Sequence, residues 1–233
     1  MIRFTIFGIP VEIQPWFWVM VFFLGGGMRM GQGTTWLEIT TFAVIALISI
    51  LVHELGHALV GRRLGGGRAH IVLWGMGGLA YNHGGRFDRN GRMWMILAGP
   101  GAGFFLGILT LLVLAILTDP GSAVSFAGLV LIGIGKITPE IAELFQDQSL
   151  RAYIFIQFLY INFLWSLINL LPVHPLDGGQ FADLFIKNRN HTHWLGVICG
   201  AAAAVVFVIL GKAYAALLFG MLAYQNYAAI EKR

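Results

Sequence analysis

The sequence predicts an all-α polytopic transmembrane protein, with about six transmembrane helices and a small re-entrant β-hairpin. Composition is the first reason: 58% of the 233 residues are hydrophobic and only 11% are charged, whereas soluble domains carry about 25% charged residues. The second reason is the mean hydropathy of +0.77. The third is that the apolar residues fall into runs near the ~20 residues that cross a bilayer. An integral, multi-pass protein surrounded by a lipid bilayer is therefore expected.

Six apolar runs are candidate spans: 16–28, 36–60, 93–117, 153–171, 194–210 and 213–227. The first run is short. Only Gly211 and Lys212 separate the last two, so one kinked or re-entrant segment is the alternative there. The connection 64–92 is rich in glycine and contains the strand-like run Ile71–Trp74. It predicts a glycine-broken hairpin over 71–81 that dips into the membrane and offers a free strand edge to a substrate.

The basic residues predict an orientation. The net charge is +4 and the pI about 9.5, but the basic residues lie mainly between apolar runs, so no nucleic acid partner is expected. If the second run ends in the cytosol, eleven of the 15 Lys and Arg residues are cytosolic. The other four lie on the opposite side of the membrane: Arg29, Lys136, Arg151 and Lys212. The positive-inside rule then places both termini in the cytosol. Small size and the lack of targeting signals favour a prokaryotic plasma membrane.

The second run contains the motif His53-Glu54-Leu55-Gly56-His57. On a helix, residues four apart share one face, so both imidazoles can reach one metal ion. A glutamate after the first histidine suits the base that activates a zinc-bound water. Ionisable groups in an apolar span cost about 2.5–3.5 kcal/mol each at the helix centre, and are usually retained for function. The motif predicts one Zn²⁺ per chain; a polar patch satisfied by neighbouring helices is the alternative.

A third ligand is required, because catalytic zinc usually has three protein ligands. The best candidate is Asp177, within the segment NLLPVHPLDGG at 169–179. Two prolines and two glycines prevent a regular helix there, and irregular backbone at membrane depth is tolerated only against protein or a wet cavity. An aspartate at this place also suits the N-cap of a helix over 178–186. The residue types alone leave both roles open.

HELGH at 53–57, AGP at 98–100 and NLLPVHPLDGG at 169–179 together make the chain resemble the site-2 protease family of intramembrane zinc metalloproteases. The resemblance covers about residues 42–190. We expect one membrane-embedded metalloprotease domain over 1–233. The chain would be a minimal member of the family, without a PDZ or CBS domain. It implies that His53, His57 and Asp177 bind zinc and that Glu54 is the catalytic base. It also implies an endopeptidase that cleaves transmembrane protein substrates near the cytosolic face.

One departure from the family concerns the substrate side of the site. Many members have an asparagine shortly after Ala-Gly-Pro, where this chain has Gly101-Ala102-Gly103. Asn169 is our first candidate to polarise the scissile carbonyl in its place, and Asn162 the second. The glycines at 99, 103 and 107 recur every four residues and predict close helix packing.

Two other functions are weighed against a protease. A zinc-binding membrane transporter would need polar groups along a path through several spans, but here the ionisable residues cluster at one depth. A catalytically inert relative that binds membrane proteins would have no need for Glu54, which is intact. Both features favour the enzyme.

Overall fold

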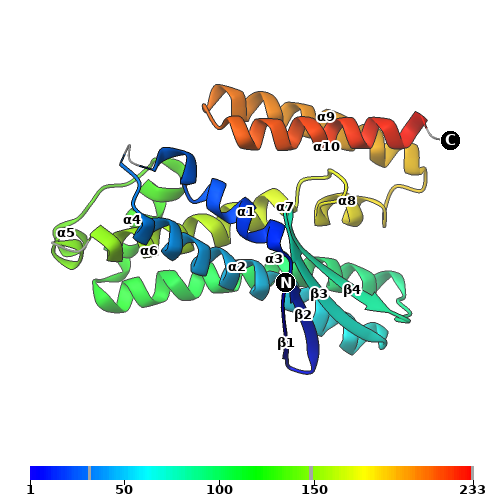
Figure 1. Ribbon diagram of the computed structural model, residues 1–233, viewed down its shortest axis with the longest axis horizontal. Coiled ribbons are helices and arrows are strands. Elements are labelled where there is room, and N and C mark those ends of the chain that lie inside the picture. The colour runs from blue at the N-terminus through cyan, green and yellow to red at the C-terminus, as the bar shows by residue number, and fades with distance from the viewer. Residues whose placement is uncertain (31–32, 147–148, 232–233) are drawn as a thin grey trace.

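The computed structural model describes residues 1–30, 33–146 and 149–231, and most of them are helical (Figure 1). The strands are β1 (Ile2–Ile6), β2 (Ile9–Ile13), β3 (Arg68–Trp74) and β4 (Gly77–His83). The helices before the irregular segment are α1 (Pro15–Leu24), η1 (Gly27–Arg29), α2 (Trp36–Gly65), α3 (Arg89–Leu117), α4 (Pro120–Ile132), α5 (Pro139–Phe145), α6 (Ser149–Tyr160), the π-helical η2 (Ile161–Trp165) and α7 (Ser166–Asn169). The helices after it are α8 (Asp177–Ala182), α9 (Arg189–Ile209) and α10 (Ala213–Glu231).

The strands form one sheet in the order β1-β2-β3-β4. The predicted hairpin is confirmed as β3 and β4, which pair antiparallel. The rest of the sheet corrects the all-α prediction: the first thirteen residues form a second hairpin, whose β2 runs parallel to β3. Phe7 and Gly8 both have positive φ, 53° and 74°, as a two-residue type I′ turn requires. Alternation of apolar and polar residues over 2–13 was the signal that the search for long apolar runs missed.

Four helices, and not six, are long and apolar enough to cross a membrane within the described part of the chain: Trp36–Gly65, Arg89–Leu117, Leu150–Asn169 and Arg189–Ile209. The first predicted span is a helix of only 10 residues, α1. The last, α10, has 19 residues, but its second half contains Gln225 and Asn226, which lower its hydropathy. The chain reverses between α9 and α10 at Gly211, with φ +67°. These are therefore two helices lying side by side (Figure 1) and not one kinked segment.

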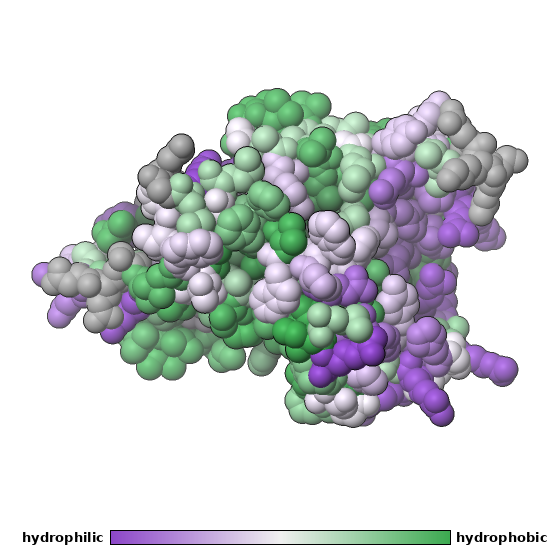
Figure 2. Space-filling model, in the orientation of Figure 1, coloured by the Kyte–Doolittle hydropathy of each residue, from purple (hydrophilic) through white to green (hydrophobic). Residues whose placement is uncertain are grey.

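The surface agrees with an integral membrane protein. Figure 2 shows hydrophobic side chains over much of the helical body, with hydrophilic ones gathered at the end where α3 and α9 begin. Many large apolar side chains are exposed, among them Phe105 at 68% and Ile116 at 82% on α3. Exposed apolar surface on this scale is expected for helices that face lipid.

Glycines allow the central helices to approach closely. Side-chain carbons added to Gly56 of α2 would overlap the Ala98 carbonyl of α3, and those added to Gly103 would overlap Ser166. A Cβ at Gly107 would lie 2.8 Å from the Phe163 ring in η2. The predicted glycine ridge therefore packs α3 against α2 and against the continuous helix formed by α6, η2 and α7.

Candidate metal centre

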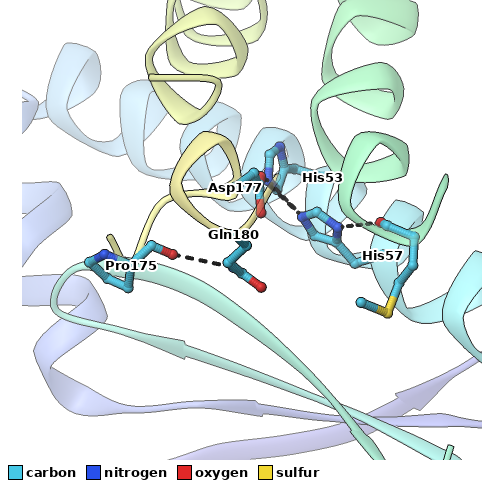
Figure 3. A network of polar contacts seen from close by, with 6 residues as sticks. His53, His57, Pro175, Asp177 and Gln180 are labelled. Atoms are coloured by element: carbon cyan, nitrogen blue, oxygen red, sulfur yellow. Dashed lines mark hydrogen bonds and ion pairs between the residues drawn. The ribbon is translucent and has the colours of Figure 1, made fainter. Parts of the chain in front are cut away.

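His53 and His57 lie on one face in the last turns of α2, with ring centroids 4.9 Å apart. Asp177 reaches them from α8, 124 residues further along the chain. His53 is 3% exposed and Asp177 is 7% exposed, so the group is buried. Asp177 is the first residue of α8, and the N-cap before it is Leu176, without a capping side chain. The structure thus directs the Asp177 carboxylate to the histidines and not to the helix terminus (Figure 3).

The three candidate ligand atoms form a nearly equilateral triangle. Nε2 of His53 and Nε2 of His57 are 3.2 Å apart, and Oδ2 of Asp177 lies 3.2 Å from the first and 3.3 Å from the second. Zn–N and Zn–O distances of about 2.0–2.1 Å give tetrahedral ligand separations of roughly 3.3 Å. The described residues contain this one group of three or more His, Cys, Asp or Glu side chains able to hold an ion. The donor set and its spacing therefore fit zinc.

The His57 ring is held by the backbone of α3. Its Nδ1 lies 2.8 Å from the Met95 carbonyl oxygen. A carbonyl only accepts hydrogen bonds, so Nδ1–H donates and Nε2 keeps its lone pair. A hydrogen bond of this kind orients many metal-binding histidines. The sequence does not predict the role of Met95, because any residue supplies a backbone carbonyl. The pattern of side chains therefore does not indicate which carbonyl accepts the hydrogen bond.

Glu54 occupies the space between α2 and β4. It is 5% exposed, and its carboxylate interacts with the backbone of Ala80. A Cβ at Gly78 would lie 2.6 Å from Oε1 of Glu54, so only glycine leaves room for the carboxylate there. The hairpin thus forms a wall of the site, and β4 approaches Glu54 directly.

Two glycines of α8 have no side chain, so the segment before α8 can pack closely against that helix. Added Cβ atoms would overlap the Leu170 carbonyl at Gly178 and come within 2.7 Å of the His174 backbone nitrogen at Gly179. Gln180 also donates from Nε2 to the Pro175 carbonyl oxygen at 3.3 Å (Figure 3). These contacts give Asp177 a fixed position although its segment is irregular.

A cavity of about 780 Å³ opens onto the histidines, Glu54 and Asp177. Asn169 lines it and is 8% exposed, so the first candidate for polarising a carbonyl faces the same cavity as the candidate ligands. Asn162 is not among the lining residues. Its Nδ2 donates to Ser49 Oγ and to the Phe158 carbonyl oxygen, both at 2.9 Å. The structure therefore places Asn169 at the cavity and Asn162 in the α2–η2 contact.

The model of peptidase family M50 matches residues 41–211, which include both histidines, Glu54 and Asp177. This chain belongs to peptidase family M50. Together with the relatives and the solved structure described next, this match confirms the resemblance to site-2 proteases and the expectation of zinc.

Several relatives are named as zinc metalloproteases. The chain is 24% identical to zinc metalloprotease MJ0392 of Methanocaldococcus jannaschii, over 80% of this chain and 45% of that protein. It is 29% identical to the putative zinc metalloprotease Rip3 of Mycobacterium tuberculosis, over 76% of this chain and 40% of that one. It is 25% identical to the putative zinc metalloprotease sll0528 of Synechocystis, over 95% and 57%. The chain thus spans about half the length of these curated relatives.

A solved structure shows the same fold. The site-2 protease from Methanocaldococcus jannaschii superposes with a TM-score of 0.59 over 99% of this chain and 94% of that one, at 20% sequence identity. The superposition extends beyond the 41–211 region matched by the family model, over the N-terminal strands that the sequence reasoning missed.

Proposed function

We propose that this M50 protein is an intramembrane endopeptidase, in which His53, His57 and Asp177 bind one zinc ion and Glu54 is the catalytic base. The observation that carries the proposal is the triangle of candidate ligand atoms, which lie 3.2–3.3 Å apart. The triangle is buried at a cavity, and the carboxylate of Glu54, which is not one of the three ligands, lines the same cavity. A bound zinc would polarise the scissile carbonyl and lower the pKa of a water molecule. Glu54 accepts that water's proton and returns it to the leaving amine. Asn169 donates to the carbonyl oxygen.

The substrate is a transmembrane protein segment, unwound where it is cut. β4 is an edge strand in the sheet order, and residues 78–82 line the cavity. An extended segment pairing with β4 would lie beside Glu54, since edge strands bind peptides through main-chain hydrogen bonds. Prolines introduced singly over 77–83 test this idea. Those that remove an N–H facing the cavity should reduce cleavage and leave zinc bound; equal cleavage by all folded variants would contradict strand addition.

Several features support cleavage near the cytosolic face. Arg62 and Arg63 lie in the last turn of α2, just beyond the histidines. β2 pairs with β3, which follows that end of α2, so the N-terminal strands lie there too. Basic residues at this end, followed along the chain by Arg68, fit the positive-inside rule. Accessibility of single cysteines to a membrane-impermeant reagent, applied from either side of oriented vesicles, tests the orientation.

One comparison tests the enzyme itself. The parent, Glu54→Gln and the exposed-carboxylate control Glu143→Gln are purified, their zinc content is measured, and each is incubated in proteoliposomes with a single-span substrate. We expect zinc in all three and cleavage by the parent and by Glu143→Gln alone. A zinc transporter or an inert relative would bind zinc without cleavage by any of them. Equal cleavage by the parent and Glu54→Gln would overturn the role of Glu54.

A further inference from the structure

The cavity extends far beyond the metal centre, along α2. Its α2 wall is a single helix face, with residues spaced four apart: Glu38, Phe42, Ala46, Ile50 and Glu54. Sixteen residues of helix cover about 24 Å, which is most of the roughly 30 Å hydrocarbon core. Apolar residues of α1 and α10, including Met20, Val21, Leu218 and Leu222, line the same cavity. An elongated, largely apolar occupant fits such walls.

The wall formed by α6 is different, because it is polar. Tyr153, Gln157 and Tyr160 line the cavity at helical spacing. Gln157 is half-buried, and its carboxamide has no hydrogen-bond partner among the described residues. A carboxamide with two donors and an acceptor loses free energy in apolar surroundings unless it finds partners. Polar residues inside membrane helices are accordingly functional candidates by default.

One hydrogen bond and one electrostatic interaction between α2 and the α6–η2 helix indicate the depth of Gln157. The phenol of Tyr153 lies within electrostatic reach of Glu38, and Asn162 donates to Ser49 at 2.9 Å. The two helices therefore run parallel, and Gln157 lies near the level of Phe42. That level is about ten residues before His53, or about 15 Å along the helix. Gln157 is thus too far from the metal centre to take part in the chemistry.

We propose that Gln157 is a specificity-determining residue, whose carboxamide binds a hydrogen-bonding side chain of the substrate's transmembrane segment. This inference rests on the proposed function, which supplies the occupant. A lipid acyl chain would fit the apolar walls equally well but offers no hydrogen-bonding group at this depth. An Asn, Gln, Ser or Thr in a substrate helix does offer one, and hydrogen bonds of this kind link helices within membranes. The enzyme would then select substrates with a polar residue some distance from the cleaved bond.

The distance predicts where that polar residue lies. If the substrate between the two points is helical, 15 Å corresponds to about ten residues; if it is extended, to about five. A single-span substrate with an all-leucine core is therefore compared with versions that carry one asparagine at successive positions. The preference should peak about five to ten residues from the cleaved bond, toward the N-terminal end of α2.

The test compares the parent, Gln157→Leu and Gln225→Leu in proteoliposomes. Gln225 is an exposed glutamine on α10 and does not line the cavity, so it is a matched control. We expect the parent to cleave the best-placed asparagine substrate roughly threefold faster, as kcat/KM, than the all-leucine one. The ratio should fall to about one in Gln157→Leu and stay at the parent value in Gln225→Leu. An equal preference in parent and Gln157→Leu, or no preference in the parent, would overturn the proposal.

A binding measurement separates this proposal from the proposed function. Glu54→Gln and the double variant Glu54→Gln/Gln157→Leu are titrated with the same two labelled substrates in vesicles. Tighter binding of the asparagine substrate, lost in the double variant, supports the subsite whether or not the parent hydrolyses anything. Identical affinities for both substrates would reject the subsite even if the parent is an active protease.

Discussion

Gly99 of α3 lies directly against the His57 imidazole, and a methyl group added to Gly99 would overlap Nε2 of that ring. This Nε2 is one of the three candidate ligand atoms. The Met95 hydrogen bond prevents the ring from turning away freely. We therefore predict that Gly99→Ala displaces the imidazole and weakens zinc binding by about 10- to 100-fold, as loss of an interaction that supports a metal ligand typically does.

Gly101 provides the matched control for Gly99. It lies in the same helix, and an added Cβ would meet nothing within 4 Å. Gly101→Ala should therefore keep the parent's zinc affinity, measured by chelator competition, and should unfold at the same or a slightly higher temperature. Equal zinc affinity in Gly99→Ala and Gly101→Ala would show that the metal centre does not depend on this contact.

Gly78→Ala should separate catalysis from metal binding. A Cβ at Gly78 would press on the Glu54 side chain, 2.6 Å from Oε1, and its three nearest neighbours are all atoms of Glu54. The flexible side chain can move away, so we expect normal zinc content but a kcat lower by about 100-fold, since misplacing a catalytic group by about 1 Å has such an effect. Loss of zinc in this variant, or unchanged kcat, would contradict the position assigned to Glu54.

The sequence predicts the grouping of His53 and His57 from local signals, whereas the resemblance to the family supplied the ligand role expected of Asp177. Helical periodicity places His53 and His57 on one face whatever surrounds them, and the prolines and glycines around Asp177 predict irregular backbone near it. The supports of the centre depend instead on which helix face meets which neighbour. The Met95 carbonyl meets His57 because α3 packs on α2, and Gly78 meets Glu54 because β4 packs on α2. The residue pattern of one sequence does not specify this packing.

The described residues contain fewer apolar helices of spanning length than the six predicted runs, for a related reason. Composition alone cannot distinguish an apolar segment that crosses the membrane from a short one buried in the protein. Phe17 and Val21 of α1 pack into the core with β2 and β3, whereas Trp16, Val19 and Phe23 are exposed. The first run is therefore apolar on its buried and its exposed faces alike, and its length of 10 residues, not its composition, sets it apart from a span. Gln157 and Asn162 are both amides in an apolar run, yet the structure gives one a cavity and the other a hydrogen-bonded helix contact. Their difference depends on α2, and the sequence of α6 alone does not predict it.

Asn226 of α10 should stabilise the segment that carries Asp177. Its Nδ2 donates to the His174 carbonyl oxygen at 2.9 Å, three residues before the candidate ligand, and the side chain is 1% exposed. Asn226→Ala leaves the His174 carbonyl without this donor, and a typical intramolecular hydrogen bond contributes about 0.5–1.5 kcal/mol. We expect a lower unfolding temperature and a several-fold weaker affinity for zinc.

The neighbour of Asn226 supplies the comparison. Gln225→Ala removes an exposed amide from the same helix and should change neither the unfolding temperature nor the zinc affinity. If Asn226→Ala lowered the unfolding temperature but left zinc affinity unchanged, α10 would support the fold without positioning Asp177.

Acid should weaken the connection between α3 and α4 through Asp119. This carboxylate is the N-cap of α4 and accepts from the backbone N–H groups of Gly121 and Ser122 at 2.8 and 3.0 Å. Its hydrogen bonds with Ser122, and then that with Gly121, lower the pKa of Asp119 below its ordinary value. Because the folded pKa is depressed, the stabilisation is fully present above the unfolded pKa of about 3.9 and is lost as the pH falls through the folded pKa.

Asp119→Asn isolates this contribution, since asparagine is also a good N-cap but does not titrate in this range. Thermal unfolding of both proteins in detergent is followed from pH 6 to pH 3, after zinc has been removed so that the metal ligands contribute no binding step. The parent should lose more stability than the variant below about pH 4. Parallel curves for the two proteins over this range would show that the folded and unfolded pKa values of Asp119 are the same.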